Sequence, residues 1–196
     1  MTIELEEVAA DCGGKRLFGP LTLDISTDSC YLVTGEHGSG KTALIRILMG
    51  LDKPDEGRVR LLGDYKYAWL ACGAVFQDDR LIPWLTAVEN VTAVRKLTSE
   101  KAAREELALL LAPGREDLPA EELETAERRA VCIVRALSVP SDLIVMDEPF
   151  AGMSDEERTK ALKYIMDHKG STPLVIASCD TTGLSAFKLI DMGQKT

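Results

Sequence analysis

The pattern of apolar and polar residues predicts strands towards both ends of the chain and a mostly helical middle. Short apolar runs, or apolar residues that alternate with polar ones, are typical of strands, and such segments cover residues 3–8, 21–25, 31–33, 58–62, 73–76, 143–146, 174–177 and 187–192. Helical spacing covers residues 42–49, 155–168 and, with interruptions at Pro113-Gly114 and Pro119, about 86–137. This order favours the α/β class, with a parallel sheet as the core and a helical insertion.

Composition changes this picture little, but it excludes several functions. The 196 residues are 45% hydrophobic, which suits one compact α/β domain with room for a small subdomain. The formal net charge of −9 argues against sequence-independent binding of nucleic acid, which depends on Lys and Arg. The first residues lack the basic and apolar regions of a signal peptide, and no run approaches 18 apolar residues. We therefore expect no direct insertion into a membrane.

The cysteines indicate a reducing compartment. They are odd in number, scattered and without a C-x-x-C pair: Cys12, Cys30, Cys72, Cys132 and Cys179. This pattern argues against a disulfide framework or a zinc site and predicts a cytoplasmic location.

A glycine-rich segment between a predicted strand and a predicted helix carries the strongest chemical signal. It matches the phosphate-loop pattern G-x-x-x-x-G-K-[ST], and its residues are Gly35, Glu36, His37, Gly38, Ser39, Gly40, Lys41 and Thr42. Glycines leave backbone N–H groups bare for phosphate oxygens, and the following helix points its positive end at them. Lys41 would reach the β- and γ-phosphates of ATP, and Thr42 would hold Mg²⁺. The alternative is a glycine-rich turn that binds nothing, and His37 is read more simply as a solvent-facing loop residue.

Two carboxylates follow a second buried strand. The apolar run over residues 143–146 ends in Asp147 and Glu148. Asp147 is placed to bind Mg²⁺ opposite Thr42, and Glu148 could activate the attacking water as a general base. The alternative is two exposed acids at a strand end, which are common and need have no function. The phosphate loop upstream favours the functional interpretation.

The chain resembles the ATP-binding subunits of ABC transporters over essentially its whole length. Residues 75–91 are similar to the Q-loop segment of nitrate, sulfonate and taurine importers. Asp147, Glu148 and Pro149 match the Walker B acid, catalytic glutamate and following proline. The resemblance implies one domain over residues 1–196. Its fold would be a P-loop NTPase (RecA-like) core with a mostly parallel sheet, an antiparallel N-terminal β subdomain and a helical subdomain at about 86–137.

The resemblance also implies site residues and partners. Gln77 would contact Mg²⁺ and the water, which makes it catalytic together with Glu148. The loop from Gln77 to Trp84 would receive a transmembrane permease, which would hold the subunit at the cytoplasmic face of the membrane. Its residues 82–85 form an apolar stretch beside charged residues, as a docking site requires, although core packing is the alternative. The subunits of the family face head to tail in homo- or heterodimers.

Four positions depart from the family pattern. The family signature is Leu-Ser-Gly-Gly-Gln, and the segment aligned with it here reads Leu123-Glu124-Thr125-Ala126-Glu127. Glu124 would face the γ-phosphate bound by the opposite subunit, and two anions at about 4 Å repel by about 4 kcal/mol at a surface-like dielectric.

The other three departures concern single residues or a short loop. Cys179 stands where the switch histidine is expected, and losing one such contact typically lowers the rate by about 10²–10³. Residues 151–154 differ from the expected Ser-Ala-Leu-Asp, although Asp155 lies one place on. Cys12 replaces the aromatic residue that stacks on adenine, unless Phe18 substitutes for it.

Three functions remain open on the sequence alone. The first is a transporter ATPase with weak hydrolysis. The second is a degenerate nucleotide-binding subunit that regulates or assembles a complex. The third is a P-loop protein unrelated to transport, against which the Q-loop segment argues.

Overall fold

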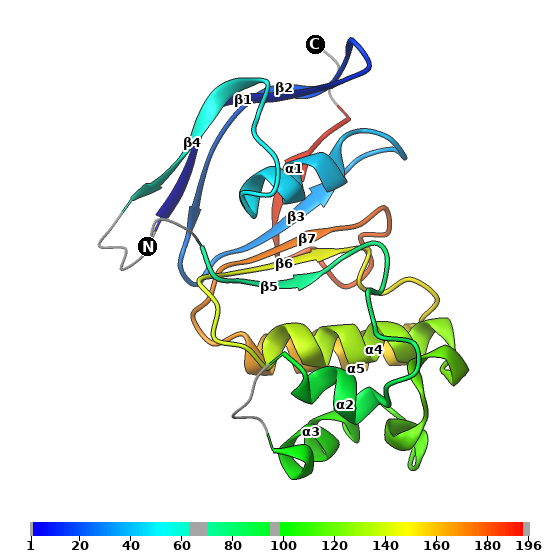
Figure 1. The fold of residues 1–196 in the computed structure, drawn as a ribbon. Helices are drawn as coiled ribbons and strands as arrows, with labels where there is room; N and C mark the ends of the chain where they lie inside the picture. Colours follow the sequence, from blue (N-terminus) through cyan, green and yellow to red (C-terminus); the bar gives the residue numbers. More distant parts are fainter. Residues whose placement is uncertain (1, 63–69, 95–98, 194–196) are drawn as a thin grey trace. The chain divides into compact units, whose positions relative to one another are not determined.

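The computed structural model describes residues 2–62, 70–94 and 99–193, which fall into two compact units. The first unit comprises Met1–Cys72, Asp142–Asp147 and Ser171–Thr196. The second comprises Gly73–Ser141 and Glu148–Gly170. One of the points at which the chain passes from one unit to the other lies between Asp147 and Glu148 (Figure 1).

The first unit begins with an antiparallel sheet of order β2-β1-β4. Its strands are β1 (Thr2–Cys12), β2 (Lys15–Ser26) and β4 (Glu56–Leu62). Ile3 and Leu5 of β1 are fully buried, whereas Glu4 and Glu6, which alternate with them, form ion pairs with Arg58 and Arg60 of β4. This alternation is what a sheet with one covered face requires, and it confirms the antiparallel N-terminal region.

The first unit also holds the parallel part of the fold. Strands β3 (Cys30–Thr34), β6 (Leu143–Asp147), β7 (Leu174–Ala177) and β8 (Lys188–Asp191) lie in the order β6-β7-β3-β8. Every residue of β6 and β7 is buried, which explains their unbroken apolar runs. Helix α1 (Lys41–Leu48) follows β3 and lies between the two sheets (Figure 1). Because β3, β6 and β7 run parallel, their carboxyl ends lie at the same edge of this sheet.

The second unit is mainly helical. Strand β5 (Cys72–Val75) leads into it from the first unit. Its helices are α2 (Ala87–Thr92), α3 (Glu100–Leu107), α4 (Thr125–Leu137) and α5 (Asp155–His168), with 3₁₀ turns at Arg115–Asp117 and Ala120–Glu122. Helices α4 and α5 lie side by side, and α2 packs against α3 and α4 (Figure 1).

The helical stretch expected at about 86–137 is more broken than the sequence pattern predicts. Residues 95–98 of it lie outside the described residues. Between α3 and α4 the chain forms only the two short 3₁₀ turns. Pro113 cannot donate a helical hydrogen bond, and Gly114 has φ 85°, so the break follows from the residues already noted there. By contrast, α5 covers the predicted residues 155–168, and a capping box of Ser154 and Glu157 explains its start.

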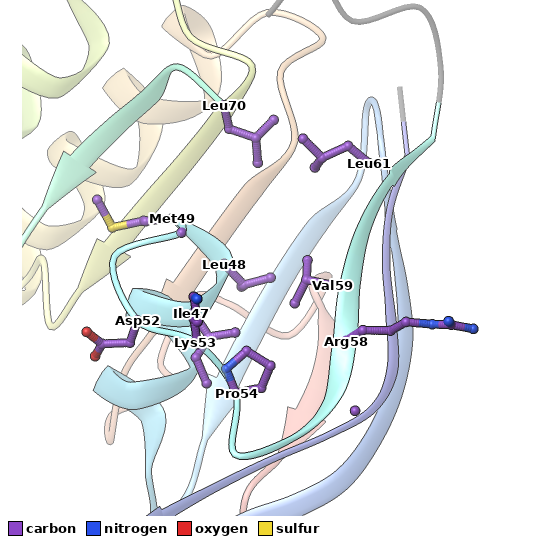
Figure 2. A pocket seen from close by; sticks show the side chains of 12 residues that line it. Ile47, Leu48, Met49, Asp52, Lys53, Pro54, Arg58, Val59, Leu61 and Leu70 are labelled. Carbon is purple, nitrogen blue, oxygen red and sulfur yellow. The ribbon is translucent and has the colours of Figure 1, made fainter. Parts of the chain in front are cut away.

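A cavity of about 520 Å³ lies between the end of α1 and strand β4 in the first unit (Figure 2). Leu48 and Val59 project into it from the two sides. Two of the charged groups at its rim are engaged elsewhere, since Asp52 pairs with Arg46 and Arg58 with Glu6. The cavity adjoins the C-terminal end of α1, whereas the glycine-rich loop leads into the other end, so it is separate from the site below.

Candidate functional site

The glycine-rich loop joins β3 to α1 in a conformation that needs glycine. Gly38 and Gly40 have φ 79° and 95°, in the left-handed region that side chains disfavour. A Cβ atom on Gly40 would lie only 2.7 Å from Cδ1 of Phe18. Gly40 is also the N-cap of α1 and offers no side chain to cap it. The first N–H groups of the helix are thus left for another acceptor, which suits an anion.

The lysine of the loop is buried and points back across it. Lys41 is 7% exposed. Its Nζ donates hydrogen bonds to the carbonyl oxygens of Gly35 at 2.7 Å and Glu36 at 3.0 Å. A buried ammonium must be compensated by acceptors, and here the loop backbone provides them. The positive charge of Lys41 therefore lies against the start of the glycine-rich loop.

Two side chains that are 105 residues apart in sequence meet beside this lysine. The Oγ1 of Thr42 donates a hydrogen bond of 2.6 Å to Oδ2 of Asp147. Thr42 belongs to the first turn of α1, and Asp147 ends the buried strand β6 and is 3% exposed. A hydroxyl and a carboxylate are oxygen ligands of the kind that Mg²⁺ takes in nucleotide sites. The donor set therefore fits a magnesium ion.

A cavity of about 350 Å³ opens beside the glycine-rich loop. Its lining comprises Lys15, Arg16, Leu17, Glu36, His37, Gly38, Ser39, Met192 and Gly193. No Phe, Tyr or Trp of the described chain is among these residues. Phe18 is only 6% exposed and its ring lies against Gly40, while the exposed Cys12 ends β1. Phe18 therefore packs beneath the loop and is not available to stack on a base.

Cys179 also reaches this loop. It lies two residues beyond β7, is exposed, and its Sγ is 3.8 Å from the carbonyl oxygen of Gly35. The parallel pairing of Val33 with Ala177 explains the approach, because it aligns the ends of β3 and β7. The residue predicted at the switch position thus lies beside the loop, but it brings a thiol instead of an imidazole.

The remaining predicted catalytic residues lie in the second unit. Gln77 is exposed and follows β5. Glu148 is half-buried and has φ 46°, a left-handed backbone that costs about 1–3 kcal/mol in a residue with a side chain. Such strain is concentrated at functional sites. The structure therefore brings Lys41, Thr42, Asp147 and Cys179 together in one unit and holds Gln77 and Glu148 in the other.

The segment aligned with the family signature surrounds the start of α4. Leu123 is buried, and Glu124 is an exposed residue just before the helix. The backbone N–H of Glu124 donates to Oε2 of Glu127 at 2.8 Å. The hydrogen bond from Arg115, together with this backbone N–H, holds the pKa of Glu127 below its usual value despite partial burial. The first turn of α4 is thus bordered by two carboxylates, of which that of Glu127 stays ionised.

The apolar stretch at 82–85 is largely on the surface. Trp84 is 73% exposed and Ile82 38%. Core packing, the alternative reading of these side chains, is not what the structure shows. The buried Asn90, which is 2% exposed, supports the stretch by donating hydrogen bonds to the carbonyl oxygens of Ile82 and Leu85. Ile82 and Trp84 are therefore a candidate interaction surface.

Comparison with known proteins assigns the family. A family model described as ABC transporter matches residues 18–151. The chain belongs to the ABC transporter family. An aliphatic sulfonates import ATP-binding protein of Pseudomonas syringae is 34% identical over 96% of this chain and 68% of its own length. A cytochrome c biogenesis ATP-binding export protein of Brucella abortus is 29% identical over 98% and 96% of the two chains. This chain is therefore an ABC ATP-binding subunit, with similarity to importers and an exporter.

Solved structures agree with this assignment. The dimeric structure of MJ0796, a bacterial ABC transporter cassette, superposes with a TM-score of 0.76. It is 26% identical in sequence, and the match covers 97% of this chain and 95% of that one. The P-loop NTPase fold of the ABC cassette is thereby established. Among the described helices, none has the length and apolar character needed to span a bilayer.

Sequence reasoning missed the arginines of α4. Arg129 is 5% exposed, and Arg128, Arg129 and Arg135 all contact the segment that carries Gln77. The sequence does contain a signal for them, because Arg128, Arg129 and Arg135 are three arginines in a helix whose other residues are mostly buried. A buried arginine needs several acceptors, but the sequence does not say which carbonyl groups provide them.

Proposed function

We propose that this ABC subunit binds MgATP in the first unit and hydrolyses it slowly, working with a separate membrane permease. One observation carries the proposal. The Thr42–Asp147 hydrogen bond of 2.6 Å joins the two oxygen donors expected for Mg²⁺ beside the buried ammonium of Lys41. Family membership supports both nucleotide binding and hydrolysis, since ABC ATPases generally hydrolyse ATP.

The triphosphate would lie along residues 35–42. Backbone N–H groups of this loop would donate to the phosphate oxygens, with the positive end of α1 behind them. The Lys41 ammonium would exchange its carbonyl acceptors on Gly35 and Glu36 for oxygens of the β- and γ-phosphates. Thr42, Asp147 and Gln77 would hold Mg²⁺, which neutralises charge on the phosphates when bound.

Hydrolysis would depend on Glu148 as the general base for the attacking water, with Gln77 orienting that water. Two features would slow the reaction. Cys179 provides a weak thiol donor beside Gly35 where the family has an imidazole. Glu124 presents a carboxylate at the start of α4, the end of a helix that otherwise favours anions.

Partners are proposed from the surface and from the family. The loop from Gln77 to Trp84, with Trp84 73% exposed, would dock on the permease and hold the subunit at the cytoplasmic face of the membrane. Two ATP-binding subunits would face each other, and each ATP would lie between one phosphate loop and the opposite signature segment. Homo- and heterodimers both satisfy this arrangement, and a partner with an intact signature would leave one site able to hydrolyse ATP.

A second candidate function is a degenerate subunit that binds nucleotide and regulates a complex with little or no turnover. The exposed Glu124 favours it, because a carboxylate at this position repels the γ-phosphate of the opposite site. The two candidates agree on nucleotide binding and differ only in turnover.

Measuring steady-state ATP turnover with and without the cognate permease distinguishes the two candidate functions. We expect wild-type turnover to exceed that of Glu148→Gln by about 10²-fold, because the amide cannot accept the proton of water. ATP binding should survive the substitution. Turnover that is absent from both proteins despite tight ATP binding would favour the regulatory subunit.

A further inference from the structure

The segment that carries Gln77 has no regular secondary structure of its own. Residues 76–80 follow β5 as bends and irregular chain, and Arg80 has φ 49°. Backbone carbonyl groups outside strands and helices need other partners when they are shielded from water. In this segment the partners come from α4, which lies in the same unit.

Arg129 of α4 donates to the two carbonyl groups that flank Gln77. Its Nη1 donates to the carbonyl oxygen of Phe76 at 2.5 Å, and its Nη2 donates to the carbonyl oxygen of Gln77 itself. The Nη1 is also 3.4 Å from Oδ1 of Asp79. The side chain is 5% exposed, and its Nε is buried with no hydrogen-bond partner in the described structure. The guanidinium is therefore committed to this segment.

The geometry of the two carbonyls decides what this contact does. The carbonyl of Phe76 belongs to the peptide group before the Cα of Gln77, and the carbonyl of Gln77 belongs to the peptide group after it. One rigid guanidinium that holds both groups fixes φ and ψ of Gln77. It thereby sets the direction of the Cα–Cβ bond. A lysine ammonium is a point charge and cannot hold two peptide planes in this way.

A second arginine of α4 holds the same segment without touching these groups. Arg135 donates to the carbonyl oxygen of Arg80 at 2.8 Å and to that of Asp79 at 2.9 Å. It contributes packing and hydrogen bonds of the same kind, from the same helix, two or three residues further along the segment. Arg135 is thus a matched control for any effect that Arg129 has through Gln77.

We propose that Arg129 is the positioning residue for Gln77, acting through the backbone on both sides of it. The proposal rests on the function proposed above for Gln77, which is contact with Mg²⁺ and the attacking water. Because α4 begins at the segment aligned with the signature, Arg129 also links the Gln77 loop to the helix whose first turn would meet the opposite nucleotide.

The test is a double-mutant cycle on turnover with Arg129→Lys, Gln77→Ala and the two together. We expect Arg129→Lys to lower turnover by about 10- to 100-fold, the usual effect of displacing a positioned group. In the Gln77→Ala background the same change should have less than about a twofold effect. Arg135→Lys should leave turnover within about twofold. ATP affinity without Mg²⁺ should stay the same throughout, because Lys41 and the phosphate loop belong to the first unit.

Backbone ¹⁵N relaxation provides a readout that needs no hydrolysis. The order parameter of Gln77 should fall from about 0.85 to below about 0.6 in Arg129→Lys and stay unchanged in Arg135→Lys. Thermal unfolding of each variant checks that it is folded.

The outcomes separate the two proposals. Additive losses of turnover in the cycle, equal losses in Arg129→Lys and Arg135→Lys, or an unchanged order parameter at Gln77 would each overturn the role of Arg129. A wild-type protein that binds ATP without turning it over would refute the proposed hydrolysis alone, and relaxation would then decide on Arg129.

Discussion

At the scale of single residues, the fold brings a few chemically important side chains together at one loop. Lys41 is buried against two carbonyl groups, and Thr42 reaches Asp147 across 105 residues of sequence. A buried ammonium and a buried carboxylate are each costly without partners. Both have partners here, Lys41 in the loop carbonyl groups and Asp147 in Thr42, and buried charged groups of this kind are concentrated at functional sites.

Cys179 offers a direct probe of this loop. Its thiol is exposed and lies 3.8 Å from the Gly35 carbonyl oxygen, so a bound triphosphate should shield it. We expect MgATP at about nine times its dissociation constant to slow alkylation of Cys179 by N-ethylmaleimide about tenfold, which corresponds to occupancy of about 90%. Peptide mass spectrometry after timed quenching measures the rate at each cysteine.

Lys41→Ala is the control for this labelling. Shielding should disappear in that variant, because the nucleotide no longer binds. Cys132 should stay unlabelled in every sample, since burial raises the pKa of its thiol to about 11. Equal labelling of Cys179 with and without MgATP would mean that the nucleotide lies elsewhere.

Residue patterns predicted this part of the site because its chemistry is local. The spacing of Gly35, Gly40 and Lys41 follows from the shape of a phosphate, and Asp147 follows a recognisable buried strand. The sequence pattern does not decide the role of Phe18, since an aromatic residue near a loop can stack on a base or pack beneath the loop. Only the three-dimensional contact with Gly40 decides for packing.

At the scale of elements, α4 begins at the segment that we align with the family signature. The helix begins at Thr125, directly after Glu124, and the Glu124 N–H is taken by the carboxylate of Glu127. A helix start normally attracts anions. Here two side-chain carboxylates surround it, and Glu127 is kept ionised by Arg115, so a phosphate from an opposite subunit would meet negative charge.

Restoring the family residues at this helix start should strengthen ATP-driven dimerisation. In Glu124→Ser/Thr125→Gly/Ala126→Gly the repulsion of about 4 kcal/mol disappears, and the bare backbone can approach the γ-phosphate. We expect a larger dimer fraction than in wild type in sedimentation velocity runs with ATP. Glu148→Gln can be added to all samples to prevent turnover.

Glu121→Ser is the matched control, because it removes an exposed carboxylate near the same helix but outside the aligned segment. It should leave the dimer fraction as in wild type. A triple variant that stays monomeric with ATP would contradict this account of the signature segment.

Helices with strong local signals were predictable, and those that depend on tertiary contacts were not. The start of α5 follows from Ser154 and Glu157, and its 14 residues match the expected span. The region at about 86–137 is rich in helix-forming residues, but α2 ends at Thr92. The hydrogen bonds from Asn90 to the preceding loop and the break at Pro113 shape this region, and a composition average does not register them.

At the scale of the whole molecule, the proposed functional residues are divided between the two units. The first unit holds the phosphate loop, Asp147 and Cys179, and the second holds Gln77, Glu148 and the segment aligned with the signature. In the proposed function, binding of the triphosphate would depend on the first set, and hydrolysis would also require the second. Nucleotide binding can therefore be tested independently of turnover, dimerisation and the permease.

Calorimetric titration of the purified chain with ATP and Mg²⁺ tests the central claim most directly. Wild type and Lys53→Ala, which removes a lysine beside the other cavity, should bind with the same affinity. Lys41→Ala should weaken binding by at least about 100-fold, or about 2.7 kcal/mol. Equal dissociation constants for wild type and Lys41→Ala would contradict the account.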